Sequence, residues 1–296
     1  AAYGELLLTD TGYYKPNSLN NAVTANAPSH NVLLIDGQGA PNKGILNSWG
    51  DQDAFLKNFV SNERLQWAEA WQDYESTQIQ RGVAFVRERY FVVADRLDTE
   101  IEESRTYQWR IHANAGLDAG GAASATDCNA TIERDLAGID VRVATTAGAC
   151  TFVEPPHTPL QPPHVHLFDA DRTPRDHTVF DATLEAVEPN FLAVMVPYAR
   201  NAEAGSPDGP LTIEEIEAGV GAAVYRVEHS DGDDVIWLRD DDAPTELILS
   251  GDKSFRTDGA LTIISNDGAS GLLVRGTRVQ LNGTSIAQTS SDVHVW

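Results

Sequence analysis

The chain has 296 residues, with 44 acidic and 21 basic side chains and a formal net charge of −23 at pH 7. Such a surface repels nucleic acid and anionic membranes, so the composition argues against both as partners. It also repels a polyanionic sugar chain, so a site for such a substrate would need arginine concentrated locally. The sequence contains no apolar run of about 18 residues, which predicts that no helix spans a membrane.

Two short apolar runs near the amino end, residues 6–8 and 32–35, are typical of buried strands. Asp10 follows the first run and His30 precedes the second. If the two strands are neighbours, a carboxylate and an imidazole meet at one end of a sheet, where they suit zinc or a similar divalent cation with a third ligand. The structural alternative is that Asp10 hydrogen-bonds its own turn and His30 caps a strand end.

Residues 53–74 show mixed periodicity, because the first apolar side chains are spaced as on a helix. From Leu65 onward the apolar residues alternate, which favours a strand. On that strand Trp67 and Trp71 share one face, either as core residues or as an aromatic platform for sugar rings.

Strands are predicted over residues 83–86 and 90–94, joined by a tight turn, and again over residues 106–112. Arg110 and His112 lie on the same face of the last of these strands. That face is either directed toward a substrate cleft or occupied by ordinary, hydrogen-bonded strand side chains.

Cys128 and Cys150 flank a strand-turn-strand pattern over residues 130–143. We favour a disulfide across neighbouring strands over two buried thiols, and a disulfide implies an oxidising compartment. A proline-rich stretch follows, in which His164 and His166 would make a surface metal site if they do not simply belong to a solvated loop.

Short strands separated by Gly, Asp and Asn turns continue to the carboxyl end, and no helix of ordinary length is predicted. The expected fold is all-β, a large antiparallel β-sandwich of stacked sheets with a small C-terminal β module. We place the large sandwich at residues 1–230 and the smaller module at residues 231–296, packed on the first.

Four segments carry a resemblance to a known family. They are TDTGYY at 9–14, SHNVLLIDGQG at 29–39, RGVAFVRERYFVVADR at 81–96 and YQWRIH at 107–112. They follow the order found in the β-sheet half of heparinase II/III-like polysaccharide lyases, so the chain resembles that family over residues 1 to about 112.

The resemblance implies that Asp10 and His30 are ligands of a zinc ion, with one or more ligands from outside this chain. It also suggests Tyr13 or Tyr14, at the start of the loop 11–29, as an acid or base, although packing at the strand end is the default. In the family a helical toroid and an H-x-H-x-D-like segment precede the sheet half and supply catalytic groups and another metal ligand. We find neither in this sequence, and expect a helical half on the same precursor or on another chain.

By this resemblance the chain is the β-sandwich part of a lyase that cleaves uronic-acid-containing polysaccharide by β-elimination, with a structural metal. Its partner would be an acidic polysaccharide, and its location secreted, extracellular or periplasmic. The alternative is a non-catalytic, extracellular carbohydrate-binding or matrix-assembly module derived from such a lyase. The sequence leaves open whether the chain is itself an enzyme.

Overall fold

The computed structural model describes residues 1–11, 26–41, 54–155, 175–204, 206–216, 220–248, 253–265 and 268–296. Strands make up 58% of the structure and helices 3%, which confirms the predicted all-β fold. The described helices are two short 3-10 turns, η1 (Ala27–Ser29) and η2 (Leu117–Ala119). None of the described residues forms a helix long and apolar enough to cross a membrane.

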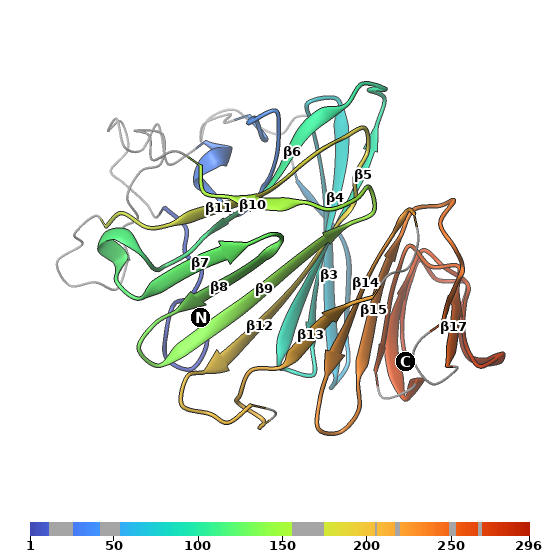
Figure 1. Ribbon diagram of the computed structural model, residues 1–296. Coiled ribbons are helices and arrows are strands. Elements are labelled where there is room, and N and C mark those ends of the chain that lie inside the picture. The colour runs from blue at the N-terminus through green and yellow to red at the C-terminus, as the bar shows by residue number, and fades with distance from the viewer. Residues whose placement is uncertain are drawn as a thin grey trace.

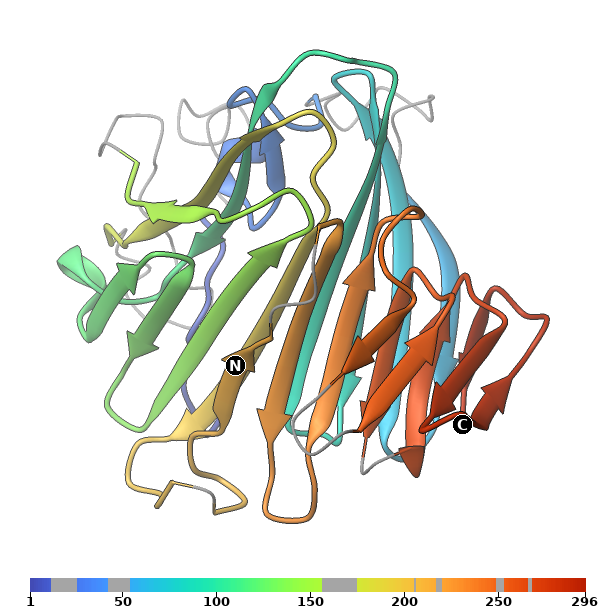
Figure 2. The ribbon, with the colours of Figure 1, turned by 45° about the vertical axis from the view of Figure 1, so that its right-hand side comes forward.

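The strands form four antiparallel sheets (Figures 1 and 2). The first sheet has the order β1-β6-β11-β10, with β1 (Leu33–Ile35), β6 (Arg105–His112), β11 (Val179–Ala186) and β10 (Thr151–Val153). The second sheet has the order β2-β3-β4-β5-β12-β9-β8-β7, with β2 (Phe55–Ser61), β3 (Leu65–Tyr74), β4 (Thr77–Val86), β5 (Tyr90–Thr99), β12 (Phe191–Ala199), β9 (Ala137–Thr145), β8 (Asn129–Glu133) and β7 (Ala122–Thr126).

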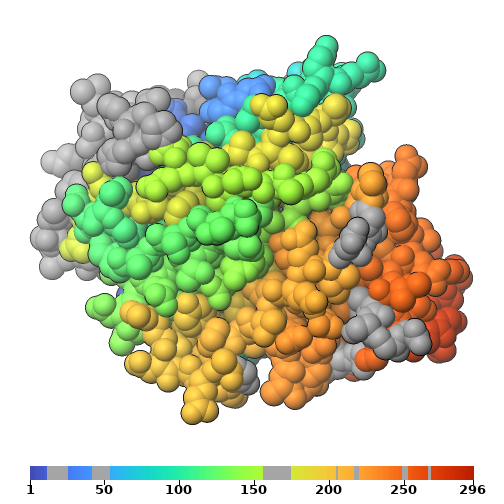
Figure 3. Space-filling model, viewed as in Figure 1, coloured from blue at the N-terminus to red at the C-terminus, as the bar shows by residue number. Residues whose placement is uncertain are grey.

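The third sheet has the order β13-β14-β15-β18-β19-β22, with β13 (Thr212–Glu215), β14 (Ala222–Glu228), β15 (Asp234–Arg239), β18 (Leu261–Ser265), β19 (Ser270–Val274) and β22 (Val293–Val295). The fourth has the order β16-β17-β20-β21, with β16 (Glu246–Ile248), β17 (Ser254–Thr257), β20 (Arg278–Leu281) and β21 (Thr284–Gln288). The third and fourth sheets form the orange-to-red side of the molecule in Figure 3.

The second sheet is a middle layer, because both of its faces are buried. One face contributes Val93 to a core shared with Trp109 of the first sheet. The other face contributes Val92 to a core shared with Ile236 of the third sheet. The third sheet in turn packs its far face on the fourth. Strands covered on both sides need apolar residues at successive positions, which explains continuous runs such as FLAVMV at 191–196.

The predicted domain boundary at residue 230 falls between β14 and β15, which are paired neighbours in the third sheet. Grouping the strands by sheet would instead place a division before β13. The domain boundary at residue 230 therefore stays a prediction. Residues 222–228 and 234–239, on either side of it, belong to one sheet.

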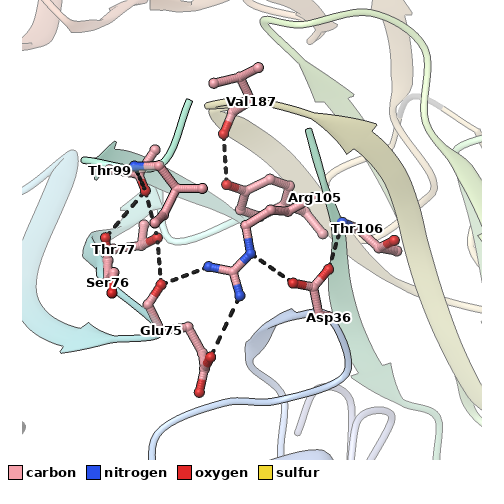
Figure 4. A network of polar contacts seen from close by, with 10 residues as sticks. Asp36, Glu75, Ser76, Thr77, Thr99, Arg105, Thr106 and Val187 are labelled. Carbon is pink, nitrogen blue, oxygen red and sulfur yellow. Dashed lines mark hydrogen bonds and ion pairs between the residues drawn. The ribbon is translucent and has the colours of Figure 1, made fainter. Parts of the chain in front are cut away.

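A polar network joins the first sheet to the second at one end of the sandwich (Figure 4). Arg105, at the start of β6, donates 2.7 Å bonds to the Asp36 carboxylate and to the Glu75 carbonyl. The same carboxylate accepts a 3.0 Å bond from the Thr106 backbone N–H. Arg105 therefore ties the turn after β1 to the turn between β3 and β4, and fixes how the first sheet sits on the second.

Candidate metal centre

Asp10 and His30 lie in direct contact, with 2.6 Å between His30 Nδ1 and Asp10 Oδ2. They are brought together by β6. The Thr9 N–H bonds to the His112 carbonyl, and the Arg110 N–H bonds to the Val32 carbonyl, both at 2.9 Å. The two segments that were expected to be neighbouring strands therefore lie end to end along one edge of β6. Residues 6–8 make a single bridge, Leu8 to Ala113, rather than a full strand.

The Asn31 side chain connects the two segments. Its Nδ2 donates to the Thr9 carbonyl at 2.7 Å, and its Oδ1 accepts a 2.8 Å bond from the His112 backbone N–H. The Asn31 carbonyl also accepts a 2.8 Å bond from Arg81 on β4. Sequence reasoning missed this residue as a contributor, although it stands directly after His30 in the S-H-N segment. An amide that bonds both a carbonyl and an N–H is well suited to such a junction.

Buried polar side chains lie behind the pair. Arg110 makes two 2.7 Å bonds to Asp181, and its Nη1 donates to the Pro28 carbonyl at 2.8 Å. Both partners of the ion pair are nearly inaccessible, at 7% for Arg110 and 2% for Asp181. The guanidinium thus holds the η1 turn, which His30 directly follows. Its charge is satisfied within the protein rather than presented to a cleft.

His112 is fully buried, and its Nδ1 lies 2.8 Å from His177 Nε2. Burial, together with the neighbouring His177 and Arg110, holds the pKa of His112 well below its usual range. The imidazole is therefore neutral at physiological pH. In this structure His112 is a packed strand residue, adjacent to the metal candidates but covered by Pro28, whose carbonyl lies 3.3 Å from His112 Nε2.

The tryptophans are on the other side of the second sheet. Trp71 pairs with Gln80, whose side chain projects from the face opposite to that of Arg81, the residue that bonds to Asn31. Trp67 is 2% exposed and lies in the core against the third sheet, where a β-carbon at Gly82 would collide with its ring. The structure therefore does not bring Trp67 or Trp71 to the Asp10–His30 pair.

Some candidates fall outside the described residues, namely Tyr13, Tyr14, His164 and His166. Among the residues that are described, no group of three or more His, Cys, Asp and Glu side chains is placed to hold a metal ion. As metal ligands, Asp10 and His30 would thus be two members of an incomplete set. Their donors, one carboxylate oxygen and one imidazole nitrogen, fit zinc, and side-chain exposures of 50% and 37% leave room for further ligands.

Cys128 and Cys150 form a disulfide with 5.7 Å between their Cα atoms, which confirms the pairing. It joins the turn between β7 and β8 to the residue that precedes β10, and so links an edge of the second sheet to an edge of the first.

The comparisons with known proteins bear on the same region. The sequence model described as "Heparinase II/III-like, C-terminal" matches residues 1–193, a span that contains Asp10, His30 and the buried side chains behind them. The chain belongs to the heparinase II/III-like family. The predicted resemblance is therefore confirmed, and the family match extends beyond the 112 residues over which the motifs carried it.

Solved structures show the same fold for this heparinase II/III-like chain. A heparan sulfate lyase HepC mutant from Pedobacter heparinus matches with a TM-score of 0.56 and 14% identity, covering 80% of this chain and 35% of that one. A crystal structure of heparinase III matches with a TM-score of 0.54 and 13% identity, covering 80% and 34%. This chain thus spans about a third of the length of these proteins. Comparison with curated proteins found no significant match.

Proposed function

We propose that the protein is the β-sandwich part of a polysaccharide lyase that cleaves uronic-acid-containing polysaccharide by β-elimination. The observation that carries this proposal is the contact of Asp10 with His30, at 2.6 Å, within the part of the chain that matches the family. The similar structures are a heparan sulfate lyase and a heparinase III, which supports the same class of substrate.

Asp10 and His30 would hold a zinc or similar divalent ion, with at least one ligand from outside this chain. When bound, such an ion would supply a fixed positive charge between the two side chains and so hold His30 and the η1 turn near Asp10. The protein's own residues already prepare that position. Asn31 fixes the two chain ends, and Arg110 holds the Pro28 carbonyl. This is the supporting role that outer residues play around metal ligands.

Elimination needs a base that removes the proton at C5 of the uronate, a group that neutralises the carboxylate, and an acid that protonates the leaving oxygen. The described residues do not assemble all three around Asp10 and His30, since Arg110 and His112 are buried. We therefore assign the missing groups to a helical half on the same precursor or another chain. Tyr13 and Tyr14 remain weaker candidates. The disulfide supports a secreted, extracellular or periplasmic location.

The test is to incubate the natural full-length protein with alginate and with heparan sulfate, and to follow the ultraviolet absorbance of the unsaturated product. We expect absorbance to rise with at least one polymer. Loss of polymer chain length without that absorbance would indicate hydrolysis and reject the proposal. Absence of unsaturated product from either polymer over a range of enzyme concentrations would also reject it.

The alternative is a non-catalytic module that binds carbohydrate or assembles into a matrix. It is favoured by the incomplete catalytic set among the described residues. Intact mass and amino-terminal sequencing of the natural protein separate the two, since a mature start at Ala1 favours the module. A larger mass with upstream helical sequence favours the lyase.

A further inference from the structure

A concave site lies at the edge of the second sheet, away from the Asp10–His30 pair. It is a pocket of about 290 Å³ formed by the start of β2, the end of β3 and the start of β4. Its lining includes two aromatic residues, a cation, a carboxylate and an amide, namely Phe55, Trp71, Lys57, Asp73 and Gln78. Pockets that bind small ligands have this composition, with apolar walls and a few polar groups that set orientation.

The pocket faces the opposite side of the sheet from the metal candidates. Trp71 is paired with Phe55 on β2 and with Gln80 on β4, and these positions share one face. Arg81, next to Gln80, projects from the other face and bonds to Asn31. A ligand in this pocket therefore cannot touch Asp10 or His30, and its binding is separate from any chemistry at that centre.

The ring of Phe55 is unusually accessible for a residue on an edge strand. Phe55 is 56% exposed, although aromatic side chains on an open sheet edge favour unwanted association. A register shift between Leu56 and Asn58 gives β2 an extra residue, Lys57. The ammonium of Lys57 lies 3.0 Å from the centre of the Trp71 ring. The bulge thus places a cation beside an aromatic surface in a protein whose net charge is −23.

We propose that this pocket binds a sugar unit of an acidic polysaccharide. The exposed ring of Phe55 would pack against the C–H face of a pyranose, and the Trp71 ring would hold the Lys57 ammonium beside it. Lys57 would pair with its carboxylate or sulfate, and Asp73 and Gln78 would bond to its hydroxyls. The site would hold the polymer by a surface that takes no part in elimination. This binding site extends the proposed function, but polymer binding at the site does not require catalytic turnover.

The experiment is affinity electrophoresis of the full chain in gels containing alginate, heparan sulfate or neutral dextran. Acidic polymer should retard the wild type, and Trp71→Ala and Lys57→Ala should weaken binding by about tenfold or more. The matched control is Phe59→Ala. Phe59 is also on β2 and 65% exposed, but it pairs with Ala68 and so lies on the other face. Its binding should equal that of the wild type.

Several outcomes would overturn the proposal: no retardation by either acidic polymer, equal binding by Lys57→Ala and the wild type, or equal loss in Phe59→Ala. A dimer that dissociates in Phe55→Ala would show that the pocket is covered by a second copy instead. Because Trp71→Ala removes a large ring, its unfolding midpoint is measured in parallel, and Trp71→Phe should restore binding. The Asp10→Ala, His30→Ala double variant should still bind polymer, which separates failure of this site from failure of the lyase proposal.

Discussion

The hydroxyl of Tyr90 on β5 donates a 2.7 Å hydrogen bond to the carboxylate of Asp234, the first residue of β15, and both side chains are fully buried. Arg87 and His229 approach the same carboxylate at 3.0 and 3.1 Å. Burial, and then the Asp234 charge, raise the pKa of Tyr90 well above its usual range, so the phenol keeps its proton and donates. This contact joins the second sheet to the third.

Tyr90→Phe should therefore weaken the attachment between these two sheets. It leaves the ring in place but removes one donor from a buried carboxylate, which costs about 1–3 kcal/mol. Urea unfolding measures the change. The matched control is Tyr198→Phe, whose hydroxyl bonds to Glu133 at a longer 3.4 Å and should cost less. Equal losses in the two variants would contradict the role given to Tyr90.

If the proposed metal centre exists, the natural protein should carry a stoichiometric metal, and the Asp10→Ala, His30→Ala double variant should lose it because two of the proposed ligands are removed. Elemental analysis of the purified protein measures the metal content. His294→Ala, in β22, is the control and should leave that content unchanged. A double variant that keeps its full metal content would reject the site.

Arg110→Lys should lower metal affinity while the fold survives. Lysine keeps the charge near Asp181 but cannot make both the paired bonds to that carboxylate and the bond to the Pro28 carbonyl. Loss of such an outer contact typically costs about 10–100-fold in metal affinity. Competition with a chelator measures it. An unchanged metal affinity in Arg110→Lys would contradict this prediction. So would a loss of affinity no larger than the fraction of unfolded protein accounts for.

Replacing both Cys128 and Cys150 by serine should destabilise the protein by about 2–4 kcal/mol, since the closed loop then regains its freedom in the unfolded chain. The two residues are separated by 22 positions. Thermal unfolding with and without reductant measures the effect. Reductant should lower the midpoint of the wild type and leave the double variant unchanged; a wild type insensitive to full reduction would contradict the prediction.

Acid should remove the contribution of the Asp36 carboxylate to the stability of the folded protein. The backbone N–H of Thr106, and then Arg105, hold the pKa of the Asp36 carboxyl below its usual range. Its stabilisation is thus present above the unfolded-state pKa of about 3.9 and is lost as pH falls through the lower folded value. Asp36→Asn should therefore be less stable at pH 7, by under about 1 kcal/mol for so exposed a pair, and the difference should shrink below about pH 4.

Chemical denaturation of the wild type and Asp36→Asn across this pH range measures the effect. Asp241→Asn is the control, because Asp241 is 93% exposed and lies 3.4 Å from Arg96. A difference between wild type and Asp36→Asn that grows toward low pH would have the wrong sign and refute the prediction.

The sequence by itself determined the class of fold, since apolar alternation and turn residues are local properties of the chain. It also identified the family and the two metal candidates, because these rest on short motifs. Asn31 stood in one of those motifs, but its role could not be read there. It depends on β6, about 80 residues later, placing the His112 N–H within reach of the Asn31 side chain.

Only the tertiary structure distinguished Trp67 from Trp71. The two share one face of β3 and have equivalent positions in the alternating pattern. The third sheet packs over Trp67 and makes it a core residue, whereas Trp71 lies outside that core and lines an open pocket. Which part of a sheet is covered depends on contacts between strands more than a hundred residues apart, and a local pattern carries no information about such contacts.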